Sequence, residues 1–509
     1  MQRMAAKKGM EHTMQTKTHR LFAIFLMLSV VLTMSFAAMP AYAADGTAIK
    51  TADDLKAMEN NPSGSYYLAN DIEVPANLSL FTDYDRPFTG TLDGNGHTLK
   101  GYSYTSSEEW LDYVALFIHT KDATFNNLRM TDVNINLNQA GSVAALAATS
   151  VNCKFTDISV SGKIVGKYLR TAAGILAYNE GSSMTGCKNS ADITVTDAAE
   201  EGGVAGVAGS CDTMKNCTNS GKISISGKIT QGGFYAAGVA NRIGKATACK
   251  NSGAVTVSAT GSGQQIEVCT AAGVAGEVNT AVSCGNTGKV SMHATIKPTG
   301  PHIVGGVFAH AAKSASKCYN KGAVSYSGES YRGVYVGGVS GQARKISQSY
   351  NKGSVTLKIP SAKSAEENKV GGVCGTVTDM RNCYNTGTIT ATGVVFIGGI
   401  SGYANPWDDK VVSNYNTGKI KATTKGTYKG QVLAGYEGTE VVQKRNIYNN
   451  YYTGSGTGYD PVYSTPHKYV AKASKVSSIK AKNCPKLSSK YWTYSSKYGR
   501  MILKNNKEK

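Results

Sequence analysis

Cysteine is the residue type of this chain that first suggests chemistry, since 11 cysteines occur and thiolates bind metals and do redox reactions. Seven of the cysteines occupy the same position in copies of a sequence repeat. In two further copies this position holds Ser349 and Asn414, so a small side chain suffices there. No two cysteines have the Cys-x-x-Cys spacing typical of zinc sites. We therefore expect no metal, no cofactor and a column of mostly free thiols; a disulfide between neighbouring repeats is the alternative. The repeated position holds Cys153, Cys187, Cys217, Cys249, Cys284, Cys318 and Cys383.

In the copies from Cys217 onward, an asparagine follows this position by two residues, and a glycine follows the asparagine by two. Asparagine tolerates the left-handed backbone of a turn and can bond its own backbone there. Stacked amides can also bond from one repeat to the next, at about 0.5–1.5 kcal/mol for each bond. We interpret this position as a structural turn column rather than a reactive site. It comprises Asn219, Asn251, Asn286, Asn320, Asn351, Asn385 and Asn416.

The residue between cysteine and asparagine varies in the early repeats and is tyrosine in the later ones. Side chains alternate between the faces of a strand, so the tyrosines face outward if cysteine and asparagine face inward. A surface ladder of rings can stack on sugar faces, which makes it the best candidate for a binding function. The alternative is that the rings stack on one another and stiffen the protein. The candidates are Tyr319, Tyr350, Tyr384, Tyr415 and Tyr448, with Trp407 as a further aromatic residue.

Asp408 and Asp409, which directly follow Trp407, are the acidic pair that an enzyme would use. Glycoside hydrolases need paired carboxylates at a set separation, and lyases often need a cluster of acidic calcium ligands. Acidic residues are scarce in the repeats, however, and a lone acidic pair in a loop is typical of a solvated surface. We expect no catalytic residues and no enzyme activity, with a polysaccharide-active enzyme as the alternative.

The elements that must position these residues follow from the spacing of the asparagines, which recur every 31 to 35 residues. This period indicates a solenoid of stacked units, each too small to bury a core alone. Each unit has a Gly-rich strand such as 202–206, a Cys-x-Asn strand and a β-branched strand such as 254–258. The predicted fold is all-β: a single-stranded right-handed parallel β-helix with three strands per coil and about ten coils.

Four segments are expected along the chain. Residues 1–43 have a basic start, an apolar stretch and an Ala-x-Ala end, the pattern of a secretory signal peptide. Residues 44–109 form an N-terminal cap, with a short capping helix at 51–62, and the first coils. The repeats occupy 110–455, and 456–509 form a basic C-terminal cap or tail. No second apolar run reaches the ~20 residues of a membrane span, so we expect a secreted chain without a transmembrane segment after cleavage.

The formal charge of +20 is concentrated near the C-terminus. From Glu440 onward, 14 Lys and Arg residues face three acidic residues. On an exported protein this excess favours an anionic cell-wall polymer or polysaccharide as partner, or another ligand on a host or other cell surface. Nucleic acid is not expected, because no recognition motif accompanies the charge. We expect a monomer that is secreted or held non-covalently at the cell surface.

The repeat resembles the GLUG-motif repeats of bacterial surface and secreted proteins. The resemblance rests on Gly-Gly-Val-Ala-Gly at 202–206, on Cys-Tyr-Asn-x-Gly at 318–322 and 383–387, and on the Gly-rich segment 90–99. It covers about residues 48–455 and is specific for architecture. It implies a surface or secreted location and an adhesion-like role. Some such proteins carry a metallopeptidase domain, but this chain has no His-Glu-x-x-His motif, so that activity is not implied.

These patterns predict a non-enzymatic, secreted or surface-associated β-helical repeat protein that acts in adhesion or in glycan or cell-wall binding. Two alternatives stay open. One is a polysaccharide-active enzyme, a lyase or glycoside hydrolase, on the same fold. The other is a purely structural module that spaces or decorates the cell surface.

Overall fold

The computed structural model describes most of the chain that follows the predicted signal peptide. Gly46–Lys509 forms one compact unit. The predicted signal peptide 1–43 lies outside the described residues, as do Trp407 and Asp408. No helix within the described residues is long and apolar enough to cross a membrane. The described ranges are 46–107, 110–197, 202–228, 232–261, 268–296, 299–329, 332–360, 368–393, 395–405, 409–422, 428–436, 445–459 and 473–508.

A short helix precedes the first coils, as the sequence predicts. Helix α2 (Ala52–Ala57) continues into the 3₁₀ turn η1 (Met58–Asn60). The Thr51 hydroxyl accepts a hydrogen bond from the Asp54 amide at 3.1 Å, and the Asp54 carboxylate accepts one from the Thr51 amide at 3.0 Å. This capping box satisfies backbone donors at the start of the helix. Leu55 is fully buried, so α2 contributes one apolar side to the hydrophobic core.

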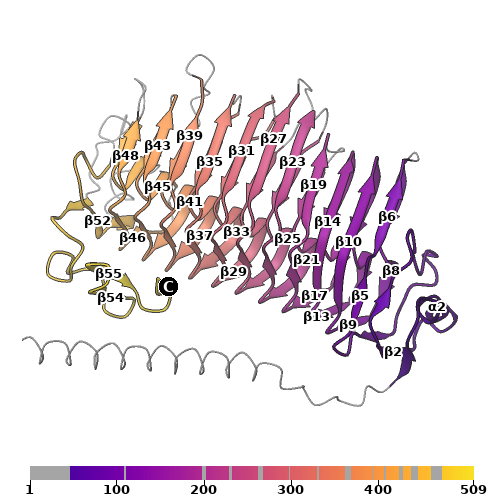
Figure 1. The fold of residues 1–509 in the computed structure, drawn as a ribbon. Coiled ribbons are helices and arrows are strands. Elements are labelled where there is room, and N and C mark those ends of the chain that lie inside the picture. Colours follow the sequence, from indigo (N-terminus) through magenta and orange to yellow (C-terminus); the bar gives the residue numbers. More distant parts are fainter. Residues whose placement is uncertain are drawn as a thin grey trace, which may run out of the picture. The chain divides into compact units, whose positions relative to one another are not determined.

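Parallel strands stacked into three sheets make up most of the rest of this unit, with strands of successive turns side by side (Figure 1). One sheet has 11 strands, each in a separate turn, which agrees with the predicted β-solenoid of about ten coils. We call them the Gly-rich strands because seven of the 11 contain glycine; they are β7 (Leu111–Val114), β11 (Ala140–Ala144), β15 (Leu169–Ala173), β20 (Gly203–Ala205), β24 (Phe234–Ala237), β28 (Cys269–Ala272), β32 (His302–Gly305), β36 (Val334–Gly337), β40 (Lys369–Gly371), β44 (Phe396–Gly398) and β49 (Tyr428–Gly430).

A 19-stranded sheet follows the Gly-rich strands in each turn. The sequence patterns indicate only a short turn there, because segments such as Ala-Gly-Ser-Cys-Asp-Thr-Met-Lys mix small, polar and apolar residues. Its strands are β1 (Thr47–Ile49), β2 (Ser65–Leu68), β4 (Thr91–Asp93), β8 (Phe117–Lys121), β9 (Thr124–Asn126), β12 (Ala147–Val151), β13 (Lys154–Thr156), β16 (Leu176–Glu180), β17 (Ser183–Thr185), β21 (Ala208–Lys215), β25 (Ala240–Thr247), β29 (Ala275–Val282), β33 (Phe308–Ser316), β37 (Ser340–Ser347), β41 (Cys374–Arg381), β45 (Ser401–Ala404), β46 (Val411–Val412), β50 (Leu433–Tyr436) and β51 (Ile447–Tyr448).

The remaining parallel sheet pairs each Cys-x-Asn strand and each β-branched strand with its counterpart in the next turn. Its strands are β3 (Ile72–Glu73), β5 (Thr98–Lys100), β6 (Ser103–Ser106), β10 (Arg129–Leu137), β14 (Ser159–Lys167), β18 (Lys188–Asn189), β19 (Asp192–Thr196), β22 (Thr218–Asn219), β23 (Ile223–Lys228), β26 (Lys250–Asn251), β27 (Val255–Thr260), β30 (Gly285–Asn286), β31 (Val290–Thr295), β34 (Tyr319–Asn320), β35 (Val324–Gly328), β38 (Tyr350–Asn351), β39 (Val355–Lys358), β42 (Tyr384–Asn385), β43 (Ile389–Thr392), β47 (Tyr415–Asn416), β48 (Ile420–Ala422), β52 (Asn450–Tyr452) and β53 (Ala473–Lys475). An antiparallel pair, β54 (Trp492–Ser495) and β55 (Arg500–Leu503), follows them.

The corner before each Cys-x-Asn strand is made by a residue with left-handed backbone. Asn216 has φ 55°, Ala248 has φ 55° and Gln348 has φ 48°. Each immediately precedes the repeated cysteine position and stands three residues before the column asparagine. The expectation that the column asparagines themselves take the left-handed corner is therefore wrong. Their side chains are instead directed into the solenoid, where they are buried.

Candidate functional site

The asparagine column lies inside the solenoid and bonds both to its own turn and to the next one. Asn251 Nδ2 donates to the Gly253 carbonyl at 2.7 Å and to Asn286 Oδ1 at 2.9 Å. Equivalent amide–amide bonds of 2.8 to 2.9 Å run unbroken from Asn189 to Asn416. A Cβ at Gly253 would lie 2.0 Å from a carbonyl oxygen of the preceding turn, so the glycine permits close stacking. This column holds turns together and is closed to ligands.

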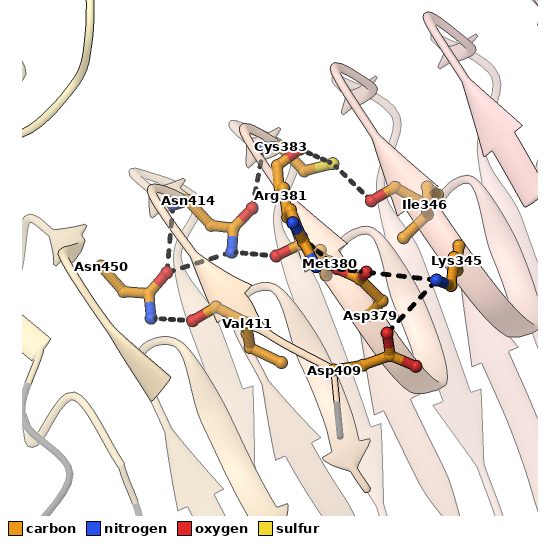
Figure 2. Close-up of polar contacts among 10 residues, drawn as sticks. All are labelled: Lys345, Ile346, Asp379, Met380, Arg381, Cys383, Asp409, Val411, Asn414 and Asn450. Atoms are coloured by element: carbon orange, nitrogen blue, oxygen red, sulfur yellow. Dashed lines mark hydrogen bonds and ion pairs between the residues drawn. The ribbon is translucent and has the colours of Figure 1, made fainter. Parts of the chain in front are cut away.

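The cysteine column is also internal, and all 11 cysteines are buried and free. The assignment of Cys153 to this column is wrong: Cys153 precedes β13, which pairs with β17, whereas Cys187 precedes β18, which pairs with β14. In Figure 2, asparagine takes its place in two late turns. Asn414 Oδ1 accepts from the Cys383 amide at 2.8 Å, and Asn450 Oδ1 accepts from Asn414 Nδ2 at 3.0 Å. Burial raises the pKa of Cys383 to about 12, so this thiol stays protonated at neutral pH. Within the described ranges, no group of three or more His, Cys, Asp and Glu residues is placed to hold a metal ion.

The tyrosine column lies on the outer side of the Cys-x-Asn strands, as strand alternation predicts. Tyr319, Tyr350, Tyr384 and Tyr415 occupy one register position in four successive turns. Their ring centroids are 5.7, 5.0 and 4.9 Å apart, with interplanar angles of 16°, 8° and 8°. The rings therefore stack on one another, which is the alternative interpretation given for them above.

Tyr448 is not a member of this column. It lies in β51 and is in register with Val412 of the 19-stranded sheet. The next ring of the column is Tyr451, which is in register with Tyr415. The sequence pattern does not reveal this member because Tyr452, rather than an asparagine, follows Tyr451 in the closing turn.

A folded segment, residues 473–508, covers the tyrosine column; we call it the C-terminal cap. Together with Tyr350, Tyr384, Tyr415 and Tyr451, it forms a second hydrophobic core outside the solenoid. Tyr350, Tyr384 and Tyr415 are at most 1% exposed, so the predicted exposed ladder is wrong for these three rings. The cap side chains buried against them are Ile479, Cys484, Leu487, Trp492, Met501 and Leu503.

Glu508 anchors the end of the cap to the solenoid. Its carboxylate accepts from Lys352 Nζ at 2.7 Å, from Arg500 at 2.6 Å and from the Tyr384 hydroxyl at 2.6 Å. Burial opposes its ionisation, but the hydrogen bonds from Lys352 and Tyr384 and the positive charges of Arg500 and Lys352 together outweigh burial, so the pKa of Glu508 lies below its usual value. Burial raises the pKa of Tyr384, which keeps its hydroxyl protonated as a donor. The carboxylate is therefore ionised and fully paired at neutral pH.

Further polar contacts spread this anchor over several turns. The Tyr415 hydroxyl donates to the Met501 carbonyl at 2.6 Å. Trp492 Nε1 donates to Asn382 Oδ1 at 3.0 Å, at one of the left-handed corners. Asn506 Nδ2 donates to the carbonyl of Cys318, three turns before Tyr415 in the column, at 3.1 Å. The cap is thus fixed along the ladder rather than at one point.

The solvent-exposed surface of the cap is basic. Its single acidic residue within 473–508, Glu508, is buried, whereas eight of its lysines are exposed to solvent. Because the Glu508 carboxylate is buried and paired, no acidic side chain of residues 473–508 offsets the positive charge of the exposed lysines. We call these eight lysines the lysine face: Lys475, Lys480, Lys482, Lys486, Lys490, Lys497, Lys504 and Lys507.

Of the predicted acidic site, only Asp409 is described, and it belongs to an ion-pair cluster on the 19-stranded sheet. Figure 2 shows Lys345 between two carboxylates: its Nζ lies 3.3 Å from Asp409 and 3.9 Å from Asp379. Arg381 donates to both oxygens of Asp379 at 2.6 and 2.7 Å. Burial raises the pKa of Asp379, while the bonds from Arg381 act in the opposite direction. Both carboxylates are thus held by cations.

Two parts of this picture are missed by the sequence analysis. Asp379 stands 30 positions before Asp409, and only the stacking of β41 on the following turn brings them together. The role of Glu508 depends on Lys352, 156 positions earlier. The one local signal for the cap is its isolated Trp492, an apolar residue in a segment rich in lysine and serine.

Residues 42–162 match the family model described as the M26 IgA1-specific metallo-endopeptidase N-terminal region. The match covers the capping helix and the first coils, which is less than half of the chain. No curated protein matches the chain. Over residues 42–162, this β-solenoid is similar to a region typical of bacterial surface or secreted proteins.

Proposed function

We propose that this chain is a non-enzymatic, secreted or surface-associated solenoid with GLUG-like repeats, which acts in adhesion by binding an anionic wall polymer or polysaccharide. The observation that carries the proposal is the lysine face of the C-terminal cap. Eight exposed ammonium groups lie on one folded segment whose only acidic residue is buried. Such a surface attracts polyanions over a range set by ionic strength.

The anchoring of the cap makes this charge more effective than a loose basic tail would be. The bonds of Glu508, Tyr415 and Asn506 fix the cap on the solenoid. A ligand then finds the lysines already positioned, so less conformational entropy is lost on binding. The similarity of residues 42–162 to a region of surface proteins supports the same location.

The test is binding to purified cell walls and to a glycan array at physiological salt. Lys480→Glu/Lys482→Glu/Lys486→Glu reverses part of the lysine face, and Lys121→Glu/Lys154→Glu/Lys222→Glu makes the same change in charge at exposed solenoid positions. We expect the cap variant to lose binding to acidic polymers and the solenoid variant to keep most of it. Blank arrays with the unaltered protein, or equal losses in the two variants, contradict the proposal.

One observation favours the enzyme alternative: Asp379 and Asp409 share a single lysine, which places two carboxylates in one cluster. Paired carboxylates are what glycoside hydrolysis requires. Against it, Arg381 engages both oxygens of Asp379. Depolymerisation of an acidic glycan that is lost in Asp409→Asn and retained in the cap charge variant would establish this alternative.

A further inference from the structure

A hollow opens in the N-terminal half of the solenoid, where the Gly-rich sheet meets the 19-stranded sheet. It has a volume of about 430 Å³, and its lining includes Tyr178, Gly203, Ser210, Tyr235 and Arg242. That volume falls in the range of about 300–1,000 Å³ typical of small-ligand sites. We call it the Tyr178–Arg242 groove.

The groove exists because one turn presents small residues between two turns with large ones. Gly203 is in register with Tyr235 of the next turn, and Ser210 is in register with Arg242. Tyr178 lies in β16, one turn before Ser210. The large side chains thus stand two turns apart, about 9.6 Å from backbone to backbone. The small turn between them forms the floor of a slot.

The walls of the slot combine aromatic faces with one cation. The side chain of Tyr178 is strongly exposed, at 57%. The Arg242 guanidinium lies 5.5 Å from the centroid of the Tyr235 ring. The Glu277 carboxylate lies 4.0 Å from Arg242 Nε, at the outer limit of an ion pair, and both side chains are largely solvated. Arg242 therefore keeps donors available for a ligand.

We propose that the Tyr178–Arg242 groove binds one carboxylate-bearing sugar residue of a saccharide chain. Tyrosine rings present flat apolar faces for the C–H side of a sugar and a hydroxyl for hydrogen bonding. The planar fork of arginine matches a carboxylate, with two parallel hydrogen bonds. The hydroxyls of Ser210 and Thr171, which also line the groove, suit the hydroxyl groups of a sugar. A slot with two aromatic walls suits a ring better than an extended acidic peptide.

This site goes beyond the proposed function, because it lies in other turns than the lysine face and recognises a single residue by shape. The two sites differ in their response to salt. Binding to the lysine face weakens steeply as salt screens it, whereas stacking and a bidentate contact in a groove persist. Measurements at about 0.5 M NaCl, where the screening length falls below about 5 Å, isolate the groove.

The experiment is calorimetric titration of the full chain at that salt concentration with a hexauronate, with 3′-sialyllactose and with a neutral hexasaccharide. The variants are Tyr178→Ala and Arg242→Gln, with Tyr494→Ala as the control because Tyr494 is a comparably exposed ring on the cap, at 47%. We expect at least one acidic probe to bind in preference to the neutral one. Each groove variant should weaken that binding by tenfold or more, and Tyr494→Ala by less than twofold.

Three results would overturn the groove. The first is that neither acidic saccharide binds the protein. The second is that Arg242→Gln binds the acidic saccharide as tightly as the unaltered protein does. The third is that polyglutamate binds as tightly as the saccharides. The cap charge variant separates the two sites: it should lose wall polymer at physiological salt and keep the oligosaccharide. If the cap charge variant loses oligosaccharide binding and the groove variants keep it, the groove proposal is wrong and the lysine-face proposal is retained. Unchanged thermal unfolding of the variants confirms that each is folded.

Discussion

One outward column of the solenoid has two halves that share a backbone position and differ in their environment. In the early turns it carries Arg129, Lys188 and Lys250, which are all exposed. In the late turns it carries Tyr350, Tyr384 and Tyr415, which are buried under the C-terminal cap. The same strand alternation thus produces a solvated surface in one half and an internal interface in the other. A column of aromatic rings indicates a ligand-binding surface only where no other segment of the same chain covers it.

Gly285 marks the boundary between the two halves. It occupies the column position in the turn before Tyr319, and a Cβ there would lie 2.3 Å from the Tyr319 ring. The first ring of the ladder therefore leans over the last uncovered turn. Glycine at position 285 leaves room for the Tyr319 ring, whereas lysine or threonine can occupy the same column position in the earlier turns.

The largest effect should come from Trp492→Ala. Trp492 is 1% exposed and packs against the rings of Tyr384 and Tyr415 at centroid distances of 6.0 and 5.4 Å. Removing a buried tryptophan side chain costs about 3–5 kcal/mol, so we expect the cap to detach and become sensitive to protease. Limited proteolysis measures this, with Tyr494→Ala on the same strand as the control. A cap that stays resistant would mean that the ladder does not hold it.

Glu508→Gln should have the next largest effect, about 1.5–3 kcal/mol, because hydrogen bonds to charged groups contribute in that range. The substitution leaves Lys352 and Arg500 without their shared carboxylate. Chemical denaturation followed by tryptophan fluorescence measures the loss. Glu180→Gln at an exposed position is the control and should leave the transition unchanged.

Acid should detach the cap through the same residue. The pKa of Glu508 is lowered in the folded chain from an ordinary value of 4.5, so its contribution is fully present above pH 4.5. That contribution is lost as the pH falls from 4.5 through the lower folded pKa. We expect protease sensitivity of the cap to rise in this window for the unaltered protein and to be flatter with pH in Glu508→Gln. Identical profiles of the two proteins would show that another group titrates.

The internal asparagine column should not distinguish the two halves. Asn251→Ala in the early turns and Asn385→Ala in the late turns each remove a bond to the local turn and a bond to the next amide. Each should cost about 1–3 kcal/mol, because buried partners are left unsatisfied. Thermal unfolding compares them. A clearly larger loss for Asn385→Ala would mean that the difference between halves extends into the core.

The smallest effect should be that of Lys188→Ala in the open half. Lys188 is exposed, and substitutions at such positions usually change stability by less than about 0.5 kcal/mol. Thermal unfolding again measures it. A loss comparable to that of Trp492→Ala would contradict the view that the early half of the column is a free surface.

The parts of this structure that depend on the repeat are predictable from sequence, since a residue that recurs every 31 to 35 positions must stack on itself. The inward asparagines and the capping helix follow from that period and from Thr51. The parts that were missed depend on unique, distant pairs. Nothing near Tyr384 in the sequence indicates Glu508, 124 positions later. Exposure of the ring column was mispredicted for this reason.

The position of the cap in the chain also has a consequence in time. Tyr384 precedes its partner Glu508 by 124 positions, and a ribosome adds about 5–20 residues each second. Tyr384 is therefore made roughly 6–25 s before Glu508, and Tyr451, the last ring of the ladder, roughly 3–11 s before it. During that interval each new molecule carries a stack of uncovered rings that can associate with the same stack on its neighbour. The rate of synthesis, and any chaperone that holds the chain meanwhile, then decides how much of it matures as separate molecules.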